Sequence, residues 1–177
     1  AEMAAKKYLA EVVMDKGLLE EVTALVEYPQ ALCCEFPKDY LRVPQEALIS
    51  SMQSHQKCFP LLNSGGKLIN HFITISNIKS LNTTMIVEGN MKVMNARLAD
   101  AAFFYDTDLK KPFAEFLKRL DSVTFQQKLG TLTDKSKRVA ALAGNIAEMM
   151  GVSKEDAMRA GELSKADLMS DMVNEFP

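Results

Sequence analysis

The amino-acid sequence predicts an α+β region followed by an all-helical region. Two adjacent glycines, Gly65 and Gly66, separate two strand-like segments and give the strongest hairpin signal in the chain. From residue 84 onward, apolar residues recur every three or four positions, which is the period of an amphipathic helix. The last third of the chain keeps this helical period, so we expect a small sheet first and packed helices afterwards.

The first 36 residues predict two helices and one strand. A helix is expected over residues 3–14, and Gly17 is expected to interrupt it. A second short helix is expected over residues 18–26, ending before Pro29 because proline disfavours a helical residue in front of it. The apolar run of residues 31–36 predicts a strand.

The middle of the chain predicts a helix and the hairpin. Pro44 stands where a helix can begin, and apolar residues follow it at helical spacing: Ala47, Leu48, Ile49 and Met52. Residues 58–62 and 67–76 flank the turn at residues 63–66. In the second of these segments the alternation of residues 72–77 predicts a strand with one buried face.

The second half predicts helices joined by short connections. A long helix begins near residue 84, with a possible joint at Gly89, and carries Val87, Met91, Met94, Leu98, Ala101 or Ala102 and Tyr105 at helical spacing. Another helix is expected over residues 110–120. Residues 123–130 then form an ordered connector.

Three further features describe the end of the chain. One helix is marked by four apolar residues, Val139, Leu142, Ile146 and Met149. Gly151 is placed to end this helix, and Ser153 is placed to begin the next one. A final helix is expected from Leu163, Leu168, Met172 and Phe176. The sequence stops at Pro177 without a polar tail, so we expect this helical region to be cut and not complete.

Composition excludes several classes of protein. The 177 residues are 47% hydrophobic and 25% charged, with a net charge of −2, as in ordinary soluble globular proteins. No apolar run approaches the roughly 20 residues of a membrane-spanning helix. The three cysteines, Cys33, Cys34 and Cys58, are odd in number and two are adjacent, so we expect reduced thiols and a cytoplasmic location without a membrane partner.

The charge is unevenly distributed. Residues 110–138 carry 8 basic and 3 acidic side chains, whereas residues 1–109 have a net charge of −3 and residues 139–177 of −4. The basic side chains of this block are Lys110, Lys111, Lys118, Arg119, Lys128, Lys135, Lys137 and Arg138. The block either binds phosphate groups or forms a solvated helix face, and the sequence leaves both interpretations open.

A short polar loop is the other candidate site. Residues His55, Gln56 and Lys57 follow an apolar helix and precede a strand, so they either present hydrogen-bonding groups to a phosphate or complete the helix end. A nucleophilic pair of Cys58 with His55 lacks an orienting third group.

The remaining motifs predict neither a catalytic residue nor a metal site. Asp106 and Asp108 are too few carboxylates for a metal site. The chain carries no phosphate-binding GxxxxGK[ST] loop, no GxGxxG and no GxSxG elbow.

Taken together, eleven segments in order over residues 18–177 resemble the beta subunit of the bacterial two-subunit glycyl-tRNA synthetase. The segments are Leu18–Pro29, Val43–Ile49, Met52–Phe59, Ser76–Ile78, Val87–Asn90, Arg97–Tyr105, Asp108–Pro112, Phe125–Leu132, Asp134–Lys135, Lys165–Leu168 and Met172–Pro177.

The resemblance implies a ligase of two alpha and two beta subunits that joins glycine to tRNA(Gly) with ATP. The alpha subunit would carry the catalytic core and use ATP, so no cofactor is expected in this chain. The beta subunit would bind and position tRNA, and this chain would be an internal fragment of it. Residues 1–125 would be part of a B3/B4-like α+β domain, and residues 126–177 the start of an HD-like helical domain.

The resemblance also bears on activity. No histidine follows His71, so the HD-like region is expected to be non-catalytic. The RNA-binding candidates are His55, Gln56, Lys57, Arg97, Lys110, Lys111, Lys128, Lys135 and Arg138. The alternatives are a scaffold that contacts the alpha subunit or other beta domains, and an editing or phosphohydrolase module for which no residue set is evident.

Overall fold

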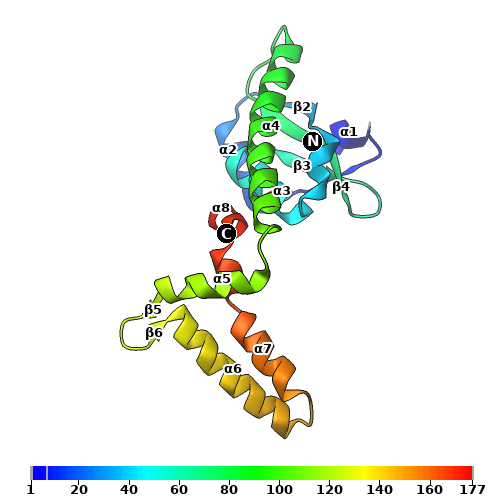
Figure 1. The fold of residues 1–177 in the computed structure, drawn as a ribbon. Helices are drawn as coiled ribbons and strands as arrows, with labels where there is room; N and C mark the ends of the chain where they lie inside the picture. The colour runs from blue at the N-terminus through cyan, green and yellow to red at the C-terminus, as the bar shows by residue number, and fades with distance from the viewer. Residues whose placement is uncertain (1, 7, 177) are drawn as a thin grey trace. The chain divides into compact units, whose positions relative to one another are not determined.

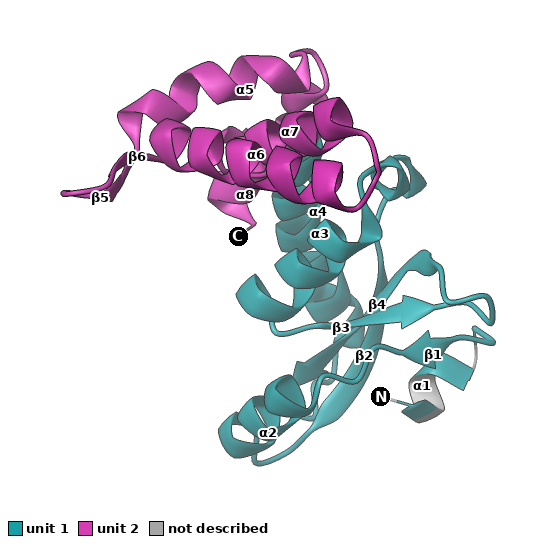
Figure 2. Cartoon of the chain, turned by 90° about the horizontal axis from the view of Figure 1, so that it is seen from below, with its two compact units in different colours: residues 1–103 teal, residues 104–177 magenta. Residues whose placement is uncertain are grey.

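The chain folds into two compact units, residues 1–103 and residues 104–177 (Figures 1 and 2). The computed structural model describes residues 2–6 and 8–176. The first unit contains a four-stranded antiparallel sheet with helices, and the second is mainly helical. The predicted mixture of α and β structure is therefore confirmed, but the prediction that the later part is all-helical is wrong, because strand β6 at residues 130–131 pairs with residues 124–126. The boundary at residue 125 and the B3/B4-like and HD-like assignments stay predictions.

The sheet of the first unit has the strand order β1-β3-β4-β2. Its strands are β1 (Glu11–Val12), β2 (Gln30–Glu35), β3 (Phe59–Leu62) and β4 (Leu68–Ser76). The predicted hairpin is confirmed as β3 and β4, which pair antiparallel. Its turn needs glycine at Gly66, where φ is +72°, and the Asn63 carboxamide oxygen accepts from the backbone of Gly65 and Lys67 at 2.9 and 3.0 Å.

The helices of the first unit agree with the predicted positions in most places. They are α1 (Glu2–Lys6), α2 (Lys16–Leu25), a 3-10 helix (Lys38–Arg42), α3 (Gln45–Ser50), a π-helical turn (Ser51–His55) and α4 (Thr83–Asp108). Asp15 caps α2, since its carboxylate accepts from the backbone of Leu18 at 2.7 Å. An interruption was predicted at Gly17 and a joint at Gly89, and both predictions are wrong. Gly17 lies inside α2, and α4 continues through Gly89 without a joint.

The predicted helix over residues 3–14 is wrong. Helix α1 ends at Lys6, and Leu9 adopts a left-handed φ of +52°. Residues Glu11 and Val12 instead pair with Leu62 and Leu61 of β3. This edge pairing gives the backbone of residues 11–12 hydrogen-bonding partners that a continuing helix would have supplied locally.

Strand β4 is covered on both faces, which corrects the prediction of one buried face. Ile73 packs in a core cluster with residues of α1, α2 and β3, including Leu18 and Phe59. On the other face Phe72 and Thr74 are buried, and the Thr74 hydroxyl donates to the Asn90 side chain of α4 at 3.3 Å. The second face of β4 is covered by α4, which begins later in the chain. The alternation of residues within the strand therefore could not predict this cover.

Replacing Gly89 by alanine should stabilise the protein. A Cβ at this exposed position of α4 meets no atom within 4 Å, so the change removes backbone freedom without a clash. We expect the free energy of unfolding to rise by about 0.5–1 kcal/mol, measured by urea denaturation. The same substitution at Gly66 is the control, because its φ of +72° should make alanine destabilising there. A loss of stability from Gly89→Ala would contradict an uninterrupted helix at residue 89.

The second unit is built from helices and one small hairpin. After the last turn of α4 come α5 (Phe113–Arg119), a 3-10 helix (Leu120–Ser122), β5 (Thr124–Gln126), β6 (Gly130–Thr131), α6 (Leu132–Met149), α7 (Lys154–Leu163), a 3-10 helix (Ala166–Met169) and α8 (Asp171–Glu175).

Three predictions for this unit need correction. Residues 123–130 are not only a connector, because β5 pairs with β6. The helix expected over residues 110–120 begins only at Phe113, after Pro112. The single final helix is interrupted at Ser170, whose hydroxyl accepts from the backbone of Val173 and so caps α8.

Helices α6 and α7 form an antiparallel pair with well-defined ends. Thr131 and Asp134 form a reciprocal capping box at the start of α6. Gly151, at φ +69°, ends α6, and the Ser153 side chain caps α7, which confirms both predicted signals.

The apolar residues that predicted α6 lie on its exposed side. Val139, Leu142, Ile146 and Met149 have exposed fractions of 39%, 61%, 48% and 87%. The buried side of α6 instead consists of small residues, namely Ser136, Ala140, Gly144 and Ala147. The helix is therefore confirmed, but these four apolar side chains lie outside its buried side. Among the described residues no helix is long and apolar enough to cross a membrane.

Candidate nucleic-acid interface

The basic block of residues 110–138 lies in the second unit and is mostly exposed. Its exposed cations are Lys110, Lys111, Lys118, Arg119, Lys128, Lys137 and Arg138. They come from the α4–α5 connection, α5, the β5–β6 hairpin and the first turns of α6. Short elements thus gather most of the basic side chains into one unit.

These cations differ in how far they are neutralised. Lys111 lies 3.8 Å from the Asp171 carboxylate, and Arg119 donates to the backbone carbonyl of Met169 at 2.9 Å. Within the described part of the chain, Lys110, Lys118 and Lys128 have no ion pair or side-chain hydrogen bond. These three ammonium groups are therefore the most available to a phosphate.

The β5–β6 hairpin adds an aromatic side chain to the basic surface. The Lys135 ammonium lies 3.9 Å from the centre of the Phe125 ring, which is 40% exposed. The hairpin projects from the rest of its unit (Figure 2), and Lys128 lies in its turn. An exposed ring beside cations is the combination that stacks nucleobases and holds their phosphates.

Asp134 moderates the charge at the start of α6. The Thr131 backbone N–H donates to its carboxylate at 2.9 Å, and this hydrogen bond is the main cause that lowers the pKa of Asp134. The Thr131 hydroxyl contributes next, and Lys137 and Arg138 lower the pKa further. Lys137 and Arg138 therefore interact electrostatically with the Asp134 carboxylate, which partly offsets their positive charge.

The polar loop of the first unit is less basic than its sequence suggests. Lys57 adopts a left-handed φ of +53°, and its ammonium donates to the Glu21 carboxylate at 2.8 Å. A cleft of about 390 Å³ beside it is also lined by Asp15. His55 is exposed and Gln56 is half-buried. The carboxylates of Asp15 and Glu21 line this cleft, and their negative charges oppose the binding of a phosphate by Lys57.

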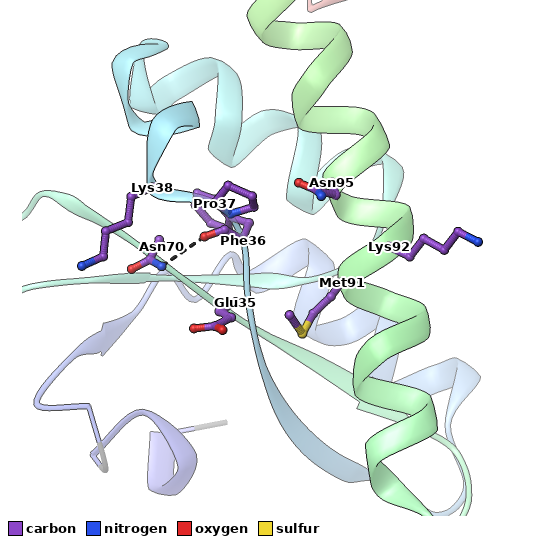
Figure 3. Close-up of a pocket in the computed structure, with 8 residues that line it drawn as sticks. All are labelled: Glu35, Phe36, Pro37, Lys38, Asn70, Met91, Lys92 and Asn95. Carbon is purple, nitrogen blue, oxygen red and sulfur yellow. Dashed lines mark hydrogen bonds between the residues drawn. The ribbon is translucent and has the colours of Figure 1, made fainter.

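A second cavity of the first unit, of about 480 Å³, was not predicted (Figure 3). It lies between the end of β2 and α4 and is lined by Glu35, Phe36, Pro37, Lys38, Asn70, Met91, Lys92 and Asn95. The Asn70 amide donates to the Phe36 carbonyl at 3.1 Å, and the ammonium of Lys92 points away from the space. The cavity therefore does not concentrate positive charge, and its lining residues have no recognisable spacing in the sequence.

The predicted candidates are distributed over both units. Lys110, Lys111, Lys128, Lys135 and Arg138 belong to the second unit, where they accompany Lys118, Arg119 and Phe125. His55, Gln56, Lys57 and Arg97 belong to the first unit, where Arg97 is exposed on α4. Phe125 was not among the predicted candidates; the available signal was its position three residues before the basic Lys128, in the predicted connector.

The structure gives no support to a nucleophilic Cys58. All three cysteines are free thiols, as predicted. Burial raises the pKa of Cys58 to about 11 and that of Cys34 to about 12. Cys58 therefore remains protonated near neutral pH, whereas nucleophilic attack needs the thiolate.

Asp108 has a structural role at the start of α8. Its carboxylate oxygens accept from the backbone of Asp171 at 3.0 Å and of Met172 at 2.8 Å. A negative charge at a helix N-terminus is favourable. Among the described residues, no group of three or more His, Cys, Asp or Glu side chains is arranged to hold a metal ion.

The raised pKa values of Cys34 and Cys58 predict a pH-dependent stability. Each folded-state pKa, about 12 for Cys34 and about 11 for Cys58, lies above the ordinary thiol pKa of 9.0, so folding favours the thiol form. Their contribution is complete below pH 9 and is lost as the pH rises toward the folded-state values. Urea denaturation should therefore show decreasing stability above pH 9. Cys34→Ser with Cys58→Ser should reduce this decrease, and an unchanged pH profile in the double variant contradicts the assignment.

Comparisons with known proteins agree with these observations. All residues, 1–177, match the family described as "Glycyl-tRNA synthetase beta subunit". The chain is 54% identical over 175 residues to the glycine–tRNA ligase beta subunit of Pseudoalteromonas translucida (strain TAC 125), covering 99% of this chain and 25% of that protein. It is 52% identical over 176 residues to that of Stutzerimonas stutzeri (strain A1501), covering 99% and 26%.

These matches define the chain first as part of an aminoacyl-tRNA synthetase subunit. It belongs to the glycyl-tRNA synthetase beta subunit family, as its sequence motifs predicted. The chain spans about a quarter of the length of these relatives.

Proposed function

We propose that this chain is a tRNA-binding and tRNA-positioning part of a glycine–tRNA ligase, without a catalytic centre of its own. The observation that carries the proposal is the set of exposed basic side chains in the second unit, in a chain that belongs to the glycyl-tRNA synthetase beta subunit family. In the complete cytoplasmic ligase, an alpha subunit would use ATP and glycine, and this part of the beta subunit would hold the RNA. Its two regions would be descendants of B3/B4-like and HD-like domains.

The second unit supplies the proposed RNA contacts. Lys110, Lys118 and Lys128 would bind phosphates directly, because their charges are not neutralised by described neighbours. Lys111, Lys135 and Arg138 would add to the positive field, and Phe125 would stack on an unpaired base.

The candidates of the first unit would contribute less. Lys57 must break its ion pair with Glu21 before it can bind a phosphate. His55 and Gln56 would supply hydrogen bonds without a permanent charge. Arg97 remains an exposed candidate on α4.

A salt titration of the complete ligase with tRNA(Gly) tests the proposal. If lysines and arginines of this region bind phosphates, the logarithm of the affinity should fall linearly with the logarithm of the salt concentration. The titration should be repeated with the isolated full-length beta subunit, where each phosphate contact contributes about 0.7–0.9 to the slope of log affinity against log salt concentration. No binding by the beta subunit at low salt would falsify an RNA role for this part of the subunit.

A scaffold function is the second candidate, and one observation favours it. The exposed apolar side of α6 is unsuited to RNA and is typical of a protein contact. The two functions are compatible, because the basic block and this apolar surface use different residues.

A further inference from the structure

Helix α6 carries four exposed apolar side chains, which we call the α6 stripe: Val139, Leu142, Ile146 and Met149. Met150 and Val152, which follow the helix, are also exposed, with fractions of 72% and 59%. The four helical positions are spaced by three, four and three residues, so they lie on one side of the helix. This spacing is that of a helix contacting a second helix.

The core of the second unit explains why the α6 stripe needs a partner. In the described part of this unit the buried apolar residues are Phe116, Leu120, Ala140, Ala147 and Ala166. Helices α6 and α7 meet with Gly161 against Ala140 and with Gly144 against Met158. The side chains of the α6 stripe lie outside this core, and a unit of about 75 residues with so few large buried side chains lacks much of the usual hydrophobic stabilisation.

We propose that the α6 stripe packs against a helix of the same beta-subunit polypeptide, from the part of that chain outside these 177 residues. The relatives are about four times as long as the matched region, so most of the subunit lies outside it. A segment on the same chain has a high effective concentration and can complete the hydrophobic core of its own domain. RNA does not fit this surface, because Leu142, Ile146 and Met149 offer no charge or hydrogen bond to a phosphate.

This inference rests on the family and on the exposed side chains, and not on tRNA binding. It identifies the second unit as part of a larger helical domain. A loss of tRNA affinity would leave it intact, and the two proposals fail in separate experiments.

Cysteine accessibility in the full-length beta subunit tests the inference. Leu142→Cys and Met149→Cys place reporters in the α6 stripe, and Ala141→Cys places a control at an exposed position on a neighbouring side of α6. Each variant is labelled with a maleimide in native buffer and in urea, and the labelled peptide is quantified by mass spectrometry. This measurement separates the reporters from Cys33, Cys34 and Cys58.

We expect both reporters in the isolated full-length beta subunit to react at least tenfold more slowly in native buffer than in urea, at every protein concentration. The Ala141→Cys control should react similarly in both. Three results would overturn the inference: fast labelling of both reporters, protection that appears only with the partner subunit, and protection that depends on beta-subunit concentration. The second result assigns the surface to the subunit interface, and the third to a second copy of this chain.

Discussion

Replacing Lys118 and Lys128 together by alanine should lower the affinity of the complete ligase for tRNA(Gly) on the order of tenfold or more near 0.1 M salt. Both ammonium groups are exposed and have no ion pair among the described residues. Each lost phosphate contact should also reduce the salt dependence by about 0.7–0.9, so the slope should become shallower by about 1.4–1.8. The change in slope distinguishes lost phosphate contacts from a general loss of folded protein.

A matched control removes the same charge elsewhere in the second unit. Lys154 donates to the Glu148 carboxylate at 2.7 Å, and Lys165 lies outside the basic block. The double variant Lys154→Ala with Lys165→Ala should leave the slope unchanged within error. If both double variants lose affinity equally, tRNA responds to net charge and not to the proposed surface. If neither changes affinity, the basic block is a solvated face, as the sequence alone allowed.

The local parts of the fold were readable in the sequence, because their causes are local. The glycines of the β3–β4 turn, the Gly151 helix end and the Ser153 cap each act within a few residues. Strand β1 could not be found in this way, since its partner β3 lies far along the chain. The same reason hid the role of Asp108, which caps α8 from 63 residues away.

The candidate site was predictable in composition but not in electrostatics. A count of charges located the basic block of residues 110–138, and the structure places all of it in one unit. The count could not show that Lys57 pairs with Glu21 or that Phe125 lies beneath Lys135. Likewise, the apolar period located α6 correctly, but periodicity does not tell which side is covered within these residues.

Replacing Gly161 by alanine should be the most destabilising of the substitutions considered for this chain. A Cβ on Gly161 would lie 2.6 Å from the Ala140 Cα and 2.8 Å from its backbone nitrogen. Backbone atoms cannot move aside without separating α6 from α7, so overpacking should cost about 2–3 kcal/mol even after alanine's better helix propensity is counted. Urea denaturation of the 177-residue chain and of the full-length subunit, followed by circular dichroism, measures this loss.

Gly144 provides the matched comparison, because it lies in the same helix pair. A Cβ there would come 2.6 Å from Met158 Cγ, 3.1 Å from its sulfur and 3.3 Å from Lys154 Cγ, all of them side-chain atoms. Side chains can rotate away where backbone cannot, and alanine gains about 1 kcal/mol in helix propensity, so Gly144→Ala should cost clearly less stability than Gly161→Ala. Equal losses at the two glycines would show that the backbone contact at Ala140 does not fix the helix spacing. A much larger loss at Gly161 means that the absent side chain sets how closely α6 and α7 approach.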